Sequence, residues 1–459
     1  MEAEEGGFIK HELSQLDLNS WRSVKESLDS FLVTIPTVLG FILSRLLCGH
    51  LPVLSTRRFL LEFLLIGLPT VILVTVGSAY SYTYSLVVSL GVLAYTYKNN
   101  PHEVPKLRYE VGKRPIVFTL LRATAYSGTC AAILAVDFPS YPFDYRKSRT
   151  FGASTMDMGI GLFVVTMGLV SQRTRNTADL KKLKRSVLPL LILGLARTIV
   201  IAAIDYHQDE TEYGRHLNAF FILGLTKLMG SFYSLLVKSD EQLLGLSLGL
   251  LFLHELLLQM GLSEFVMSSA PHEGFFSGNR EGLSSLHGCV ALYLLSIYFA
   301  KWYTSRDHLS YPDLIIKLRK ILLLAIICWL LTFISSYLTG IARVTFSFGY
   351  VVWISAVCLS LIVIYAFFFE LKLVNVDFNN KKASGDGKEK SLSLPTFVES
   401  LNTNGLTHFM LSNFLTGMVN MSLDPGHRND VESVAILSVY IFVCSGAVFI
   451  MLRKGIRIA

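Results

Sequence analysis

The sequence predicts an all-α fold: a polytopic transmembrane helical bundle with about 13 membrane-spanning helices. The composition is the first observation, since 52% of the 459 residues are hydrophobic and only 16% are charged, against about a quarter charged in ordinary soluble domains. The second is that the apolar residues form long blocks, close to the roughly 20 residues that cross about 30 Å of hydrocarbon. The third is that these blocks are continuous, unlike the alternating pattern of a membrane β-barrel.

Each block is expected to be a helix, because a segment in lipid must satisfy its backbone hydrogen bonds internally. Thirteen blocks follow one another along the chain, and the third, fifth and twelfth are short. They are Phe31–Leu47, Leu60–Gly77, Tyr82–Tyr97, Ile116–Val136, Met158–Ser171, Val187–Asp205, Ala219–Val237, Leu243–Met260, Leu286–Tyr303, Ile321–Leu338, Phe346–Glu370, Leu406–Met421 and Val434–Leu452.

The blocks divide the chain into four parts. Residues 1–30 form an acidic, polar N-terminal segment, lumenal or interfacial, without the basic start and cleavable apolar core of a signal peptide. Residues 31–371 form a transmembrane core. Residues 372–404 form a flexible cytoplasmic loop, which includes the Gly-, Ser- and Lys-rich stretch Asn379–Lys390. Residues 405–459 hold the last two spans and a short cytoplasmic tail.

The net charge of +7 is explained by topology and does not indicate a nucleic-acid partner. If the spans alternate, most Lys and Arg fall on the side that holds Lys181, Lys184, Lys388 and the C-terminal tail. The positive-inside rule then places the C-terminus in the cytoplasm and the N-terminus on the opposite side, in the lumen or outside. The six cysteines show no paired spacing, so neither a disulfide framework nor a metal motif is expected.

Polar residues gather on the opposite face. Four connections there, Asp137–Thr150, Tyr206–Asn218, His272–Gly288 and Asp424–Glu432, mix carboxylates with His, Tyr, Asn and Gly. Ionisable residues also enter or border the spans, namely Arg122, Asp157, Arg197, Asp205, Lys227, His254 and Glu255. A charge at the bilayer centre costs about 2.5–3.5 kcal/mol, so it faces a partner or a wet cavity. Pairing with an opposite charge would explain any single one of these residues. Because the whole set gathers on one face, a polar cavity is the favoured interpretation.

The segment Leu134–Lys147 is the most informative of these. Asp137 closes a long apolar block, and Pro139 cannot continue the helix. Pro142 keeps the chain extended, so a carboxylate is held at the membrane surface by a stiff turn. An ordinary helix stop with charged flanks has the same pattern.

Several motifs in a fixed order extend from about Leu120 to Asp424. They are Leu134-Ala135-Val136-Asp137-Phe138-Pro139, Met156-Asp157 with Gly159 and Gly161, Leu193-Gly194 with Arg197 and Tyr206, Thr211-Glu212-Tyr213-Gly214 with His216 and Asn218, Asn279-Arg280-Glu281-Gly282, and Leu411-Ser412-Asn413 with Asn420. In these residues the chain resembles the inositol acyltransferases of glycosylphosphatidylinositol (GPI) anchor biosynthesis, the glucosaminyl-phosphatidylinositol acyltransferase family.

The resemblance implies a thirteen-helix enzyme of the endoplasmic reticulum membrane, surrounded by membrane lipids. It moves a fatty acyl group, usually palmitoyl, from acyl-CoA to the inositol 2-hydroxyl of glucosaminyl-phosphatidylinositol. Acyl-CoA is a co-substrate, and no tightly bound cofactor or metal is expected. The family's catalytic pair, an Asp and a Lys ten residues later, corresponds to Asp137 and Lys147.

These residue types suit the reaction. A hydroxyl is a poor nucleophile unless a base accepts its proton, and Asp137 is the candidate base. Lys147 is a candidate donor to the thioester oxygen or the leaving thiolate, or it orients Asp137 through a charge pair. No Ser or Cys nucleophile with an adjacent base is evident, which favours direct transfer. Contacts to the phosphate, sugar and amine of the acceptor are expected from Arg197, Tyr206, Glu212, Tyr213, His216, Asn218, Asn279, Arg280, Glu281 and Asn413.

Three other functions stay open. A secondary transporter would usually show related halves and interrupted helices, and neither is evident. A membrane acyltransferase acting on another acceptor would rely on a buried His, for which His254 is the candidate. A structural assembly subunit would keep its function without Asp137.

Overall fold

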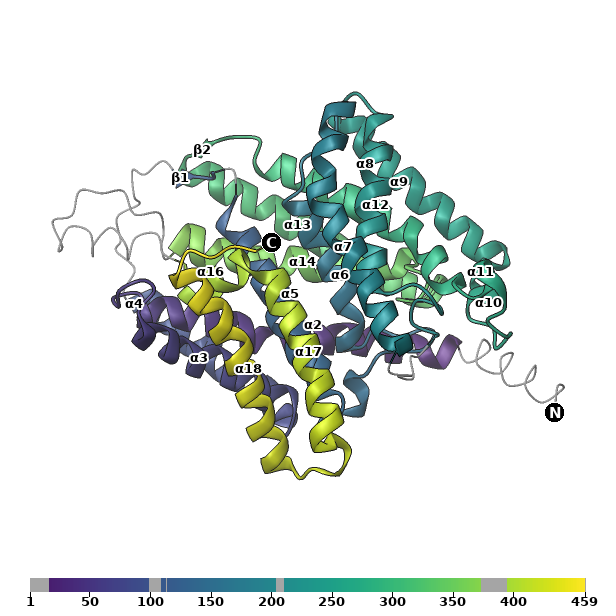
Figure 1. Cartoon of the computed structure of the whole chain (residues 1–459). Coiled ribbons are helices and arrows are strands. Elements are labelled where there is room, and N and C mark those ends of the chain that lie inside the picture. Colours follow the sequence, from purple (N-terminus) through teal and green to yellow (C-terminus); the bar gives the residue numbers. More distant parts are fainter. Residues whose placement is uncertain (1–15, 99–108, 113, 204–209, 373–393, 459) are drawn as a thin grey trace. The chain divides into compact units, whose positions relative to one another are not determined.

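The computed structural model describes residues 16–98, 109–112, 114–203, 210–372 and 394–458. Within these ranges the helices are joined by turns and loops, and two short strands, β1 (Tyr109–Glu110) and β2 (His308–Leu309), pair antiparallel (Figure 1). The predicted all-α class is confirmed.

The helices follow the apolar blocks of the sequence, and each of the thirteen blocks overlaps one of them. The helices are α2 (Leu16–Cys48), α3 (Thr56–Val74), α4 (Ser81–Lys98), α5 (Ile116–Ala135), α6 (Met158–Leu169), α7 (Thr177–Ala203), α8 (Ala219–Leu235), α9 (Asp240–Leu257), α10 (Ser263–Val266), α11 (Gly274–Ser277), α12 (Arg280–Tyr303), α13 (Tyr311–Leu338), α14 (Phe348–Tyr365), α16 (Thr396–Thr403), α17 (Gly405–Leu423) and α18 (Asp430–Arg453).

Eight helical stretches in the described part of the chain are long and apolar enough to cross a membrane. They are Ser23–Cys48, Ile116–Ala135, Thr177–Ala203, Asp240–Val266, Arg280–Tyr303, Tyr311–Leu338, Phe348–Leu371 and Asp430–Arg453. A ninth arises if α3 and α4, bent by 112° between them, form one broken span. The polytopic membrane protein is therefore confirmed, whereas the count of thirteen stays a prediction.

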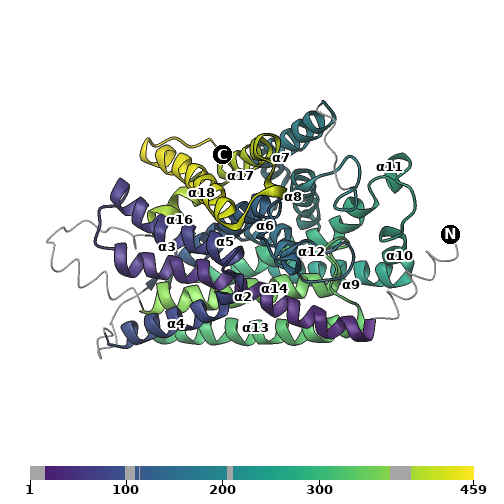
Figure 2. The same cartoon turned by 90° about the horizontal axis from the view of Figure 1, so that it is seen from below.

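The described chain forms two compact units. The described residues of the first unit fall within Met1–Leu28, Lys147–Ser305 and Leu324–Cys358, and those of the second within Asp29–Arg146, Arg306–Leu323 and Leu359–Ala459. The first unit is organised around α12, which packs against α6, α8 and α9, while α7 pairs with α8 (Figures 1 and 2). Small residues permit this close packing, because a Cβ at Gly230 of α8 would lie 2.5 Å from the Tyr293 ring of α12.

The second unit is organised around α5, α17 and α18, with α3 and α16 packed against them. Helix α16 falls within the segment expected to be a flexible loop. Its side chains Phe397, Val398 and Leu401 are buried, because the helix covers α3, α5 and α18. The remainder of that expected loop, residues 373–393, lies outside the described residues, as does the acidic start, residues 1–15.

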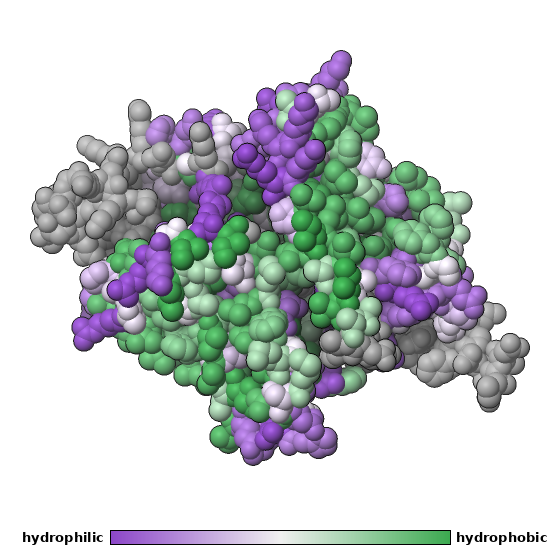
Figure 3. Space-filling model, in the orientation of Figure 1, coloured by the Kyte–Doolittle hydropathy of each residue, from purple (hydrophilic) through white to green (hydrophobic). Residues whose placement is uncertain are grey.

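Hydrophobic side chains cover the outer flanks of the helices, as expected for surfaces that face lipid. On α7 the exposed residues Leu188, Ile192, Leu195 and Ile199 recur at helical spacing. Figure 3 shows the same distribution on α17, where hydrophobic side chains cover the helix and hydrophilic ones gather at its turn into α18.

A buried ion pair joins α3 to α16 in the second unit. Arg58 and Glu62 lie one turn apart and both are fully buried, and Arg58 Nε donates to Glu62 Oε1 at 2.7 Å. The Phe397 backbone N–H donates to Glu62 Oε2 at 2.7 Å, and Arg58 Nη2 donates to the Leu394 carbonyl at 3.0 Å. The pair thus satisfies backbone groups at the start of α16.

Replacing one partner of this pair should destabilise the protein more than replacing both. Arg58→Met leaves the Glu62 carboxylate unpaired in the interior, at a cost of about 3–5 kcal/mol. The double variant Arg58→Met/Glu62→Gln should recover much of the lost Tm in detergent. Lys182→Met, which breaks an exposed pair with Asp179, should leave the Tm unchanged; a loss as large as that of Arg58→Met would contradict the explanation.

Candidate active site

The described part of the connection Tyr206–Asn218, residues 210–218, meets the connection His272–Gly288 in the first unit. Both connections are expected to be lumenal. Asn279 Oδ1 accepts hydrogen bonds from the backbone N–H groups of His216 (2.9 Å) and Leu217 (3.2 Å). Its Nδ2 contacts His216 Nδ1 at 3.1 Å and donates to the Phe275 carbonyl at 2.8 Å. Gly214 has φ +93°, and a Cβ there would lie 2.5 Å from Asn279 Cα. Asn279 therefore ties the two connections together.

Arg280 and Glu281 form a buried pair at the start of α12. Arg280 Nε lies 3.3 Å from Glu281 Oε1, and Arg280 Nη2 donates to the Ser268 carbonyl at 2.8 Å. His272 Nε2 lies 2.8 Å from the same carboxylate oxygen, and His272 Nδ1 lies 3.6 Å from Glu210. Arg280 and Glu281 therefore neutralise each other within the protein.

The other predicted contact residues are more dispersed. Asn218 caps α8, accepting from the Phe220 and Phe221 N–H groups, and donates to the Gly194 carbonyl of α7 at 2.9 Å. Asn413 of the second unit donates to the Phe409 carbonyl one turn earlier in α17. Arg197 is half-buried on α7, near enough to Tyr213 to affect its pKa. Tyr206 lies outside the described residues.

A buried ion pair that sequence analysis did not assign forms the polar centre of the first unit. Arg343, in the turn between α13 and α14, donates from Nε to Asp157 Oδ1 at 2.8 Å. Both side chains are almost fully buried. The Tyr213 ring lies under the Arg343 guanidinium, with its centroid 5.9 Å from Cζ. Asp157 was recognised as a charge bordering a span, but nothing in the sequence marks a partner 186 residues away.

The charge states of this centre follow from burial and pairing. Burial raises the pKa of Tyr213 to about 12, although the nearby Arg343 lowers it. Burial disfavours the charge on Arg343, but Asp157 outweighs this effect and raises its pKa. At neutral pH Tyr213 therefore keeps its proton and Arg343 stays charged, so neither is suited to act as a base.

Lys147 and Glu212 lie at the rim of this centre. Lys147 Nζ contacts Glu212 Oε1 at 2.5 Å, and the two side chains are 37% and 28% exposed. Two predicted site residues from different connections are thus brought together. Because the pair is partly open to solvent, the ammonium is accessible to an incoming group.

Asp137 is held in the second unit, at the end of α5. Asn420 of α17 donates from Nδ2 to Asp137 Oδ2 at 2.9 Å, and Asp137 is half-buried. Phe138 and Tyr141 are buried and fix the turn that follows. Asp137 and Lys147 belong to different units, each described with its own neighbours. Their pairing therefore stays a prediction.

A polar stripe along α17 corrects one expectation from the sequence. His408, Ser412, Thr416 and Asn420 recur every four residues, on one face of the helix. Cys130 Sγ of α5 lies 3.2 Å from His408 Nδ1 and 3.0 Å from Ser412 Oγ. A cysteine with an adjacent base is therefore present, contrary to expectation, but it is fully buried. The four-residue spacing was the signal that sequence analysis missed.

Among the described residues, His, Cys, Asp and Glu form no group of three or more arranged to hold a metal ion.

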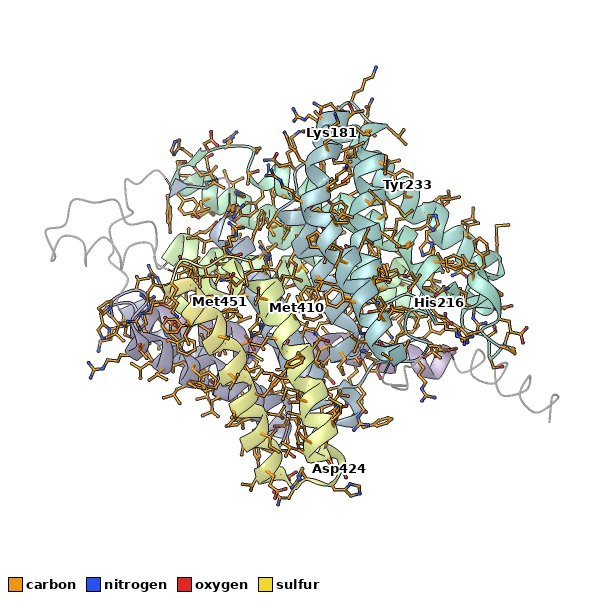
Figure 4. All side chains as sticks on the ribbon, in the orientation of Figure 1. Lys181, His216, Tyr233, Met410, Asp424 and Met451 are labelled. Atoms are coloured by element: carbon orange, nitrogen blue, oxygen red, sulfur yellow. The ribbon has the colours of Figure 1, made fainter. Side chains whose placement is uncertain are left out.

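Figure 4 shows where labelled polar and basic residues lie within each unit. In the first, Lys181 and Tyr233 lie at one end of the α7–α8 pair and His216 toward the other. In the second, Asp424 lies at the turn between α17 and α18, away from Met410 and Met451.

Comparison with known proteins identifies the family. The GWT1 family model matches residues 23–451, nearly the whole chain. The chain belongs to the GWT1 family. This GWT1 protein is 29% identical over 453 residues to the Bos taurus glucosaminyl-phosphatidylinositol-acyltransferase PIGW, covering 88% of this chain and 89% of that one. The Homo sapiens protein of the same name is 28% identical over 461 residues, with the same coverage. The GPI-anchored wall transfer protein 1 of Schizosaccharomyces pombe is 30% identical over 352 residues, covering 74% and 72%.

The family assignment confirms the resemblance drawn from the sequence motifs. The matched range includes both proposed catalytic residues and all the proposed contact residues of this GWT1 protein. Some motif residues, such as Asn218 and Asn279, form hydrogen bonds to other parts of the protein. These bonds give them a structural role in addition to any functional role.

Replacing Asn279 should loosen the 210–218 connection without unfolding the protein. Asn279→Ala removes the acceptor of the His216 and Leu217 N–H groups, and each lost hydrogen bond costs about 1 kcal/mol. Hydrogen exchange in the peptide 210–218 should become about tenfold faster. Asn413→Ala, which removes a bond within a single helix, should leave that peptide unchanged. Unchanged exchange in Asn279→Ala would exclude the tethering role.

Proposed function

We propose that this protein transfers a fatty acyl group from acyl-CoA to the inositol 2-hydroxyl of glucosaminyl-phosphatidylinositol during GPI-anchor biosynthesis. The family match over residues 23–451 carries the proposal, together with relatives named as acyltransferases of this lipid over 88% of the chain. The palmitoyl chain and acyl-CoA come from the sequence resemblance. The polytopic helical structure suits a lipid acceptor and a site in the endoplasmic reticulum membrane.

In the proposed reaction, Asp137 acts as the general base. Its carboxylate accepts the proton of the inositol hydroxyl while the hydroxyl oxygen forms a bond to the thioester carbonyl carbon. The hydrogen bond from Asn420 fixes one carboxylate oxygen and so limits the rotation of the side chain. When the tetrahedral intermediate collapses, the carbon–sulfur bond breaks and CoA leaves as a thiolate, which takes up a proton.

Lys147 supplies positive charge to this reaction. The carbonyl oxygen becomes negative in the tetrahedral intermediate, and the departing sulfur carries negative charge as well. An ammonium held by Glu212 is neutralised until a stronger anionic partner arrives. We assign the binding of the acceptor's phosphate, sugar and amine to Arg197, Tyr206, Glu212, Tyr213 and His216. Asn218, Asn279, Arg280 and Glu281 then support the connections of the first unit that carry Glu212, Tyr213 and His216. Asn413 stays a predicted contact residue in the second unit.

Direct transfer is favoured over an acyl-enzyme. Cys130 has an adjacent base, but its side chain is sealed between α5, α17 and α18. A thioester of CoA would have to part these helices to reach it. Cys130→Ala is therefore expected to retain the activity, and a large loss in this variant would favour the acyl-enzyme.

The catalytic proposal predicts specific losses of activity. Membranes containing this protein alone, given labelled acyl-CoA and glucosaminyl-phosphatidylinositol, should form an acylated lipid. Asp137→Asn should lower the rate by about 10²–10⁴-fold, because the base is lost. Lys147→Ala should lower it strongly as well. Normal product from both variants would exclude the proposed pair, whereas no product from the wild type would exclude the reaction.

The proposed orientation places the N-terminus in the lumen and the C-terminus in the cytoplasm. The separation of Lys181 from His216 along the α7–α8 pair supports opposite faces for the basic and the polar connections. A glycosylation acceptor inserted near Tyr213 should be glycosylated in cells, and one near Lys388 should not. The reverse pattern would invert the topology.

A further inference from the structure

The segment that carries Lys147 is fastened at the next residue. The Ser148 N–H points at both carboxylate oxygens of Asp157, at 3.3 and 3.2 Å, and Ser148 Oγ also donates to this carboxylate. On the other side, Arg343 Nη2 donates to the Ser148 carbonyl at 3.5 Å. Asp157 and Arg343, paired with each other, thus bind both backbone polar groups of Ser148.

The carboxylate that holds Ser148 is itself fixed from several directions. Ser154 donates to Asp157 Oδ2 from its N–H (3.1 Å), as in a capping box, and also from its Oγ (2.8 Å). The Tyr350 hydroxyl donates to the Asp157 carbonyl at 2.7 Å and accepts from the Gly161 N–H at 3.1 Å. Asp157 is therefore a rigid support for the segment before it.

The same ion pair reaches the charge partner of Lys147. The Arg343 guanidinium covers the Tyr213 ring, and Tyr213 follows Glu212 in the chain. Glu212 lies close enough to raise the pKa of Arg343, together with Asp157. Glu212 in turn contacts Lys147 Nζ at 2.5 Å. A continuous series of contacts therefore runs from Ser148 through Asp157 and Arg343 to Tyr213, and Glu212, the residue before Tyr213, contacts Lys147 beside Ser148.

A positioning role explains why a buried ion pair is present here. Replacing a buried pair by well-packed apolar groups is often neutral or stabilising, so such a pair is weak evidence for stability. A lysine ammonium on a flexible four-carbon stem needs a fixed backbone and a fixed partner to stay in one place. A misplacement of about 1 Å in a catalytic site costs about 10²-fold in rate.

We infer that Asp157 and Arg343 are positioning residues for Lys147, fixing its backbone through Ser148 and its ammonium through Tyr213 and Glu212. The inference rests on the proposed function, because it assigns these residues to a reaction in which Lys147 takes part. Asp157 and Arg343 act through Lys147 and do not touch the reacting atoms.

The test is a double-mutant cycle on the full-length protein. Arg343→Lys keeps the charge beside Asp157 but removes the second arm of the guanidinium and its planar contact with Tyr213. It should lower kcat by about 10²-fold, with KM for acyl-CoA within about threefold and the Tm nearly unchanged. In the Lys147→Ala background the same change should produce no further loss, because its effect passes through Lys147.

A matched control is Arg173→Lys, which makes the same change at another largely buried arginine of the first unit, paired with Asp240. This variant should keep the wild-type kcat. If Arg343→Lys lowers the Tm, a milder variant replaces it in the test. Ser148→Ala removes a single hydroxyl and should still lower kcat by about tenfold. Hydrogen exchange in a peptide spanning residues 146–150 should accelerate in both Arg343→Lys and Ser148→Ala.

The outcomes separate the two proposals. The positioning role is wrong if Arg343→Lys alone keeps the wild-type kcat. It is also wrong if Arg343→Lys lowers the kcat of the Lys147→Ala variant further. In either case the acyltransferase proposal stands. If Lys147→Ala itself is fully active, the positioning role falls with the role of Lys147. If the wild type forms no acylated lipid, the proposed function fails first.

Discussion

The rest of this structure depends on one constraint: a charge among apolar helices must be neutralised by a partner inside the protein. Asp157 with Arg343 in the first unit and Glu62 with Arg58 in the second satisfy it in the same way. In both, the carboxylate also accepts backbone N–H groups, from Ser148 and Ser154 in one case and from Phe397 in the other. The ion pairs therefore join segments that are distant in the sequence.

This constraint changes how the motif residues are understood. Asn218, Asn279, Arg280 and Glu281 were expected to contact substrate because polar residues in an apolar chain suggest a site. In the structure their bonds end on backbone groups and side chains of the same unit, so each has a structural role, while its contact with substrate stays a prediction. The partly exposed groups, Lys147 and Glu212 above all, are better placed to meet a substrate. In many sites, buried polar residues hydrogen-bond to the few accessible ones and so hold them in one geometry.

The second unit shows the same division along a single helix. Asn420 of α17 contacts Asp137, whereas His408 and Ser412, further along the same face, contact Cys130 deep between helices. Tyr440 of α18 donates to the Cys130 carbonyl at 3.0 Å and secures the third helix. Hydrogen bonds between helices fix their register, and the register of α17 against α5 brings Asn420 to Asp137.

The sequence by itself determined the fold class, the positions of the helices and the family. These properties follow from runs of neighbouring residues, because hydrophobicity over about 20 residues decides whether a segment is stable in lipid. The motif around Asp137 was recognised for the same reason, since its residues are consecutive. Only the tertiary structure decided which charges meet: Asp157 pairs with Arg343 across 186 residues, and α16 is buried although it lies within the segment expected to be a flexible loop. Pairing depends on packing between distant segments, which no local pattern records.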